Sequence, residues 1–113
     1  MAFPAAYNFS YYKGDTNEFV IRPKSSDGSA FDLDGYDAVF TIATARGTGA
    51  TQYEAQAVVD QVNNIVTCTI LPGVGGQLSS GTYVYDVEVS SGPSVVYTLI
   101  TGTITVTEQV TGA

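Results

Sequence analysis

The sequence predicts an all-β domain, a sandwich or barrel built from about seven antiparallel strands. Three observations lead to this fold class: β-branched residues are abundant, Gly and Pro interrupt the chain at short intervals, and several segments alternate apolar with polar residues. Alternation of this kind gives a strand one packed face and one face in water. Hydrophobic residues make up 44% of the 113 residues, so one core can form without a metal or a disulfide.

Turn-forming residues separate the first three expected strands. The first, residues 8–12, is followed by Gly14, which supplies the positive φ that a turn needs. The second, 18–22, ends at Pro23, because proline has no N–H to donate to a ladder. The third, 38–45, follows a stretch rich in Asp and Gly.

The next two expected strands, 52–59 and 65–71, form a hairpin around a polar turn. In the second of them, Val66, Cys68 and Ile70 alternate with threonines. Because these three side chains point to the same face of the strand, we expect the thiol to be buried as a small apolar group and to be inert toward thiol reagents.

The last two expected strands, 82–90 and 95–107, follow a connection in which we expect a short helical turn near residues 74–78. Strand 82–90 has the clearest alternation. Tyr83 lies near its start, where a sandwich often places a tyrosine that packs at a corner. Gly102, in the middle of 95–107, indicates a bulge or the close approach of another backbone segment.

These strands define one domain, residues 8–107, between an N-terminal arm, 1–7, and a C-terminal tail, 108–113. The arm is apolar, so we expect it to dock on another molecule. In strand 95–107 the even-numbered residues are expected to face inward, which leaves two apolar side chains facing outward. The contact residues expected on these two grounds are Phe3, Pro4, Tyr7, Tyr97 and Leu99. Alternatively, the arm covers the outward pair as a second layer of the same molecule.

The charge balance excludes several classes of partner. Lys and Arg number 4 against 11 Asp and Glu, which gives a net charge of −7. So few scattered cations cannot form the basic stripe that binds nucleic acid or the patch that binds an anionic membrane. The N-terminal residues lack the pattern of a secretory signal, and no apolar run approaches the ~18 residues that span a bilayer.

The residue types needed for much catalytic chemistry are also missing. The sequence has no His and one Cys, which removes the commonest general base, an intrachain disulfide and a Cys-based zinc site. We therefore expect neither an enzyme nor a cofactor.

Two groups of carboxylates leave alternatives open. Asp86 and Glu88 point to the same side of strand 82–90, either as a glycosidase-like pair or, as we favour, as an ordinary solvent-facing surface. Four aspartates in the loop before strand 38–45 either gather around calcium or, as we favour, form separate Asx-type turns. They are Asp27, Asp32, Asp34 and Asp37.

Several segments, taken in order, resemble a known family. They are KGDT at 13–16, FVIRPK at 19–24, SDG at 26–28, FDLDGY at 31–36, AVF at 38–40, SGTYVYDVEV at 80–89 and TGTITVT at 101–107. Their order and spacing resemble small immunoglobulin-like β-sandwich proteins of tailed bacteriophages, including the N-terminal module of baseplate upper (adaptor) proteins. The resemblance covers about residues 13–42 and 80–107.

The resemblance implies an immunoglobulin-like β-sandwich with a structural role in a virion and with no catalytic residues to carry over. We expect an accessory or decoration protein, bound in many symmetry-related copies to a capsid or another particle surface and assembled in the host cytoplasm. Its partners are then other virion proteins. The alternatives are a baseplate or tail adaptor and a carbohydrate-binding adhesion module that uses exposed tyrosines.

Overall fold

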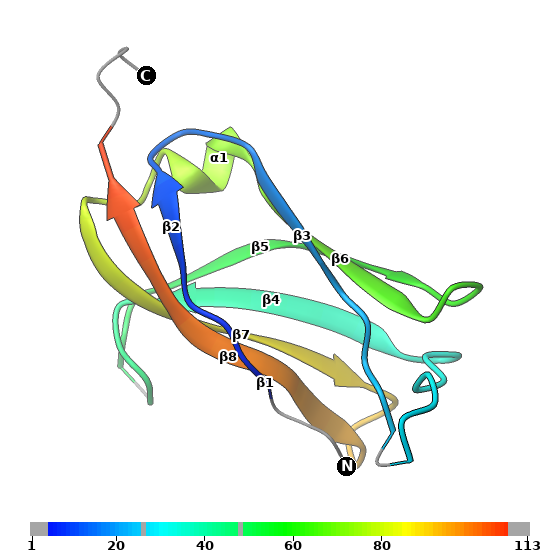
Figure 1. Ribbon diagram of the computed structural model, residues 1–113. Helices are drawn as coiled ribbons and strands as arrows, with labels where there is room; N and C mark the ends of the chain where they lie inside the picture. The colour runs from blue at the N-terminus through cyan, green and yellow to red at the C-terminus, as the bar shows by residue number, and fades with distance from the viewer. Residues whose placement is uncertain (1–4, 26, 48, 109–113) are drawn as a thin grey trace.

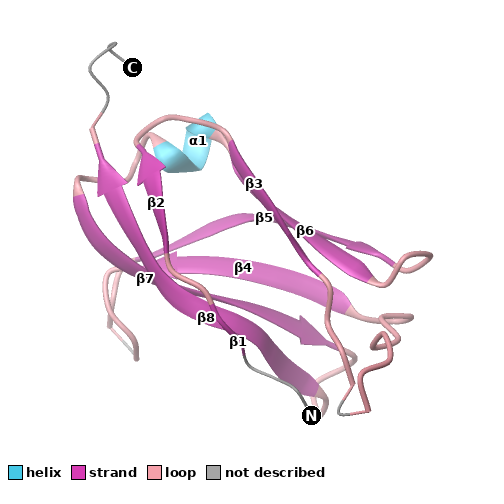
Figure 2. Ribbon diagram, viewed as in Figure 1, coloured by secondary structure: helices cyan, strands magenta, loops and turns pink. Residues whose placement is uncertain are grey.

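The computed structural model describes residues 5–25, 27–47 and 49–108 of the chain. Within these residues the protein is almost entirely β, as Figures 1 and 2 show. The elements are β1 (Ala5–Ala6), β2 (Phe9–Tyr12), β3 (Asn17–Ile21), β4 (Asp37–Ala43), β5 (Gln52–Asp60), β6 (Ile65–Ile70), α1 (Pro72–Gly75), β7 (Gly81–Ser90) and β8 (Val96–Thr107). No helix among the described residues has the length and apolar character needed to cross a membrane.

The all-β class and the strand positions predicted from the sequence are confirmed. Each expected segment corresponds to one strand from β2 to β8, with bounds that differ by no more than two residues. The expected helical turn is present as α1 and starts earlier than predicted, because Pro72 occupies its first turn. Proline is well suited to that position, where its missing N–H has no partner inside the helix in any case.

The strands form a curled sheet of mixed direction, in the order β1-β8-β7-β4-β5-β6-β3, with β2 also paired to β8. β1 and β2 run parallel to β8, so the expectation of a purely antiparallel arrangement is wrong at this edge. Strand β5 is shared between two ladders. Its residues 52–55 pair with β4, whereas residues 56–60 pair with β6. The sheet therefore turns in the middle of β5.

The hydrophobic core lies inside this curl. The ring of Phe19 on β3 meets Phe40 on β4 with 5.5 Å between centroids, and Tyr85 on β7 with 6.1 Å. Because β3 is adjacent to neither β4 nor β7 in the sheet order, these contacts cross the interior of the curl. The alternating residues of β6 and β7 fill the same space, including Cys68, which is fully buried as predicted.

The parity predicted for β8 is correct in its second half and wrong in its first. The even-numbered residues from 100 to 106 are buried, but Leu99, expected to face outward, is only 2% exposed. The pairing with β7 shifts register between Val87 and Glu88, which leaves Leu99 as the extra residue of a bulge. One extra residue reverses which side chains face the core. Leu99 is therefore a core residue and not part of an exposed contact surface.

Tyr83 occupies a corner, as its position in the sequence predicts. Its hydroxyl accepts a hydrogen bond from the backbone N–H of Ser79 at 2.9 Å, which ties the start of β7 to the connection from α1. The side chain is largely buried, and its ring lies 6.3 Å from that of Tyr53 in an edge-on contact.

Replacing Tyr83 with phenylalanine removes this hydrogen bond and leaves the Ser79 N–H without its partner. We expect the free energy of unfolding to fall by about 1 kcal/mol, measured by urea denaturation with an unchanged m-value. Tyr53→Phe is the matched control, because the Tyr53 hydroxyl makes no hydrogen bond within the described residues. Equal losses in the two variants would contradict the role given to the Tyr83 hydroxyl.

Candidate functional site

The N-terminal segment lies along β8 at one edge of the sheet (Figure 1). β1 pairs with Ile100 and Thr101, and β2 continues in the same register from Phe9 opposite Ile104. The expectation that residues 1–7 form an arm outside the strands is therefore wrong for Ala5–Ala6. The strand set begins before the predicted start at residue 8.

The main chain of Tyr7 is fixed to the domain by two hydrogen bonds. Its N–H donates to the carbonyl of Thr101 at 3.0 Å, and its own carbonyl accepts from the hydroxyl of Tyr85 at 2.6 Å. Burial raises the pKa of the Tyr85 phenol, and nearby Tyr7 raises it further. The phenol therefore remains a protonated donor throughout the neutral range. The sequence indicated that Tyr85 faces inward but not that it binds this segment.

The close backbone approach predicted at Gly102 is confirmed, and the approaching chain is the N-terminal segment. A Cβ at this position would lie 2.0 Å from the carbonyl oxygen of Tyr7. Beside it, the side-chain oxygen of Asn8 accepts a hydrogen bond from the N–H of Thr103 at 3.0 Å. Glycine is thus required here, because any larger residue would push the segment off β8.

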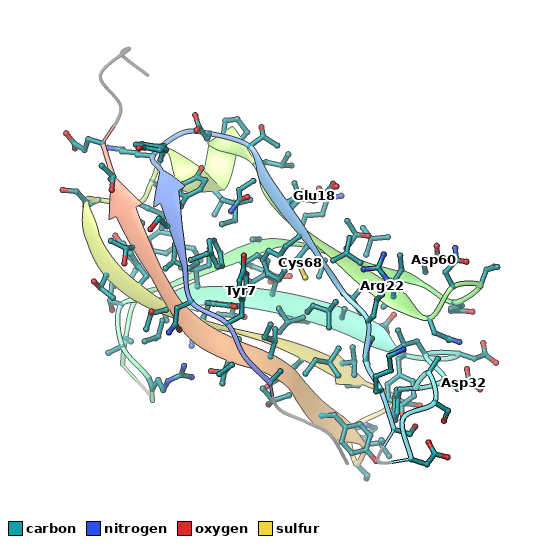
Figure 3. All side chains as sticks on the ribbon, in the orientation of Figure 1. Tyr7, Glu18, Arg22, Asp32, Asp60 and Cys68 are labelled. Atoms are coloured by element: carbon teal, nitrogen blue, oxygen red, sulfur yellow. The ribbon has the colours of Figure 1, made fainter. Side chains whose placement is uncertain are left out.

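The side chain of Tyr7 is the exposed part of this anchored segment. Its ring stacks on Phe9 with 5.4 Å between centroids, meets Phe19 edge-on at 6.0 Å, and remains 46% exposed. It therefore lies between β2 and β3, as Figure 3 shows. A tyrosine held in this way offers a large amphipathic surface, and its fixed main chain has little freedom left to lose on binding.

Of the other expected contact residues, Leu99 lies in the core. Phe3 and Pro4 lie outside the described residues. Tyr97 is half-buried and packs edge-on against Phe31, with Tyr36 in the same aromatic cluster. Among the described residues, no ring of this cluster contacts the rings of Tyr7, Phe9 or Phe19. Tyr7 and Tyr97 therefore have no ring contact with each other, and the predicted interface set as a whole stays a prediction.

The aspartates before β4 form separate turns. Asp27 accepts hydrogen bonds from the N–H and the hydroxyl of Ser29 at 3.0 and 2.6 Å, and the pKa of its carboxyl is lowered by them. Asp32 accepts from the N–H of Asp34 at 3.0 Å, and Asp37 begins β4. In the described part of the chain no three His, Cys, Asp or Glu side chains converge as metal ligands would. The geometry is that of Asx-type turns.

Asp86 and Glu88 line an open depression of about 290 Å³, together with Arg46 and Gln52. Arg46 extends from the loop between β4 and β5 and donates to the hydroxyl of Thr101 at 2.5 Å. The sequence did not place this cation beside the two carboxylates, because the path of the loop depends on contacts with a distant strand. Since the depression is open, both carboxylates stay solvated.

The thiol of Cys68 is unreactive at neutral pH. Burial raises its pKa from 9.0 to about 12. The thiolate is the reactive form of cysteine, so at neutral pH the side chain acts only as a small apolar group in the core.

No protein-family model matches the sequence, and no curated protein is similar to it at the sequence level. Among solved structures, a family 123 glycoside hydrolase from Clostridium perfringens, described in connection with glycolipid glycan hydrolysis, has a TM-score of 0.41 and 12% sequence identity. The alignment covers 93% of this chain and 23% of that chain. A likeness at this level carries no argument about activity.

Gly102→Ala places a methyl group where the carbonyl of Tyr7 lies, so the N-terminal segment must leave β8. We expect the free energy of unfolding to fall by roughly 1–3 kcal/mol and the amides of residues 5–8 to exchange faster with solvent. Gly73→Ala is the control, because a Cβ at Gly73 would meet no atom within 4 Å. Unchanged stability and exchange in Gly102→Ala would mean that the segment does not pack this way in solution.

Cys68 should resist labelling in the native state. At pH 8 we expect a disulfide reagent to react only as fast as the domain opens, because the folded thiol has a pKa of about 12 and is fully buried. In urea the unfolded thiol returns to its ordinary pKa and should react at the rate of a model peptide. Fast labelling without denaturant would contradict the burial of this face of β6.

Proposed function

We propose that this protein is a structural component of a tailed-bacteriophage particle, bound as an accessory or decoration protein to the capsid or another particle surface. The observation that carries the proposal is the ordered series of segments within residues 13–42 and 80–107 that resembles immunoglobulin-like virion proteins. These segments are far apart in the chain but supply β3, β4, β7 and β8, which pack around a common core.

The proposal includes the fold that the resemblance implies, an immunoglobulin-like β-sandwich. One layer would contain β1, β2, β8, β7 and β4, and the other β3, β6 and the second half of β5. The division of β5 between two ladders supports this arrangement, as does the hydrogen bond from the Ser79 N–H to Tyr83. A tyrosine near the start of a late strand, bonded to backbone a few residues upstream, is a recurrent feature of such sandwiches.

The exposed ring of Tyr7 supports a role in contact with other particle proteins. It projects from a main chain that is fixed to β8 and β7, and it is flanked by the apolar rings of Phe9 and Phe19. Aromatic residues with a polar tip are enriched at protein interfaces. The unpaired, buried thiol of Cys68 is consistent with assembly in a reducing host cytoplasm.

Particles of a phage that encodes this chain, banded in a density gradient, should contain it in many copies by quantitative mass spectrometry. Separated heads and tails would distinguish a capsid location from a baseplate or tail location. Tyr7→Ala should lower the number of bound copies, because the variant loses the exposed ring and keeps its main-chain hydrogen bonds. Tyr12→Ala, at a side chain that is 58% exposed on β2, is the matched control. Absence of the chain from banded particles would contradict the proposal.

A further inference from the structure

Strand β3 ends the sheet and has a free edge. It pairs with β6 on one side and has no strand on the other side within the described residues. At the opposite end the outermost strands are β1 and β2, which pair with β8 and carry no charged side chain. An unpaired edge presents a row of N–H and C=O groups that another strand can bind.

The side chains of β3 carry a pattern that suits addition of a strand. Phe19 and Ile21 point toward the core but remain only partly buried, so an added strand would cover more of their surface. On the outer face Val20 is 38% exposed, and it lies between the exposed residues Glu18 and Arg22. Figure 3 shows these two charged side chains toward opposite ends of β3.

We propose that the partner of this edge is β3 of a second copy of the chain, added antiparallel about a twofold axis that passes through Val20. In that register Glu18 of each copy lies opposite the partner's Arg22, and Phe19 lies opposite the partner's Ile21. Each dimer thus gains two opposite-charge cross-strand pairs on its outer face and two apolar pairs on its inner face.

The charges at the two ends of β3 point to a second copy of the chain as the partner of this edge. The chain has a net charge of −7, so two copies repel each other at long range, and association needs a local attraction. An antiparallel twofold contact is self-complementary only if each half carries both members of every pair. Residues 18–22 meet this condition, with one negative and one positive charge placed symmetrically about Val20.

Neither charge is strongly engaged within its own chain. Glu18 accepts a long hydrogen bond of 3.5 Å from the hydroxyl of Thr69, and Arg22 makes no hydrogen bond or ion pair with any described residue. Both are therefore available to a partner without loss of an existing strong contact. The pairing segment is short because Pro23, which cannot donate to a ladder, follows directly.

So short a strand pair predicts weak association. The buried area would lie at the low end for protein interfaces, below about 1,200 Å², and we expect a Kd on the order of 0.1–1 mM. Such a contact becomes effective when many copies are held close together on a common surface. The inference rests on the sheet edge alone and stands whether or not the chain belongs to a phage particle.

The test is sedimentation of the whole chain from about 10 μM to 1 mM. The unsubstituted protein should show a monomer–dimer equilibrium. E18R and R22E, each alone, should weaken it roughly tenfold, because each variant puts like charges opposite one another in both pairs. A 1:1 mixture of E18R with R22E should restore it, because each pair again holds opposite charges and the total charge equals that of the unsubstituted dimer.

Glu54→Arg is the matched control for E18R. It makes the same change in net charge at an exposed position on β5, where β5 pairs with β4, and should leave the dimer intact. Melting temperatures should match that of the unsubstituted chain, since all three positions are exposed. A monomer throughout the concentration range would overturn the proposal. So would a dimer that E18R does not weaken, or a mixture that does not associate better than its components.

Discussion

The division of strand β5 between two neighbours is the constraint on which the rest of the structure depends. A strand that paired along its whole length with β4 would extend a flat sheet, and the apolar face of β6 would have nothing to pack against. Because residues 56–60 pair instead with β6, the sheet turns and brings β3 over β4 and β7. The inward residues of these strands then fill a common interior, and the fold gains most of its stability from that burial.

The N-terminal segment depends on this core for its place on β8. Its carbonyl at Tyr7 is bound by Tyr85, a tyrosine whose ring packs against Phe9, Phe19 and Phe40. The missing side chain at Gly102 lets the two backbones approach. The exposed ring of Tyr7 is thus the outer end of a continuous set of aromatic contacts that begins in the core. A side chain whose main chain is held in this way has less freedom to lose on binding.

Local signals were sufficient to predict the strands, because the two-residue period and the turn residues are both short-range properties of the sequence. The bulge at Leu99 could not be predicted, because no residue in that stretch marks where the register shifts and the choice depends on pairing with β7. The pairing of Ala5 and Ala6 was also missed, since alanine has little preference for strands and the contacts that hold the segment come from residues 85 and 101–103.

In the candidate site, too, the local properties of residues were predicted from the sequence and their contacts with distant strands were not. Tyr7 was proposed as a contact residue from its own apolar character, and its ring is 46% exposed, whereas the groups that anchor its main chain were not predicted. Leu99 and Tyr97 were assigned from the parity of one strand, and the bulge that reverses this parity is a tertiary feature. Arg46 beside Asp86 and Glu88 depends on the path of a loop. Residue type therefore predicted exposure and chemistry, while position relative to distant strands required the structure.

The two edges of the sheet differ in the strands and side chains that form them, and this difference affects how copies of the chain can associate. The edge of β8 is covered by the chain's own first residues, so the outermost strands at that end are β1 and β2, which carry no charged side chain. The edge of β3 is limited by its length and by Pro23, and charges flank its centre. Charges of one sign would prevent two such edges from pairing. Glu18 and Arg22 have opposite signs and lie symmetrically about Val20, so they exclude most registers and favour one antiparallel register between identical chains.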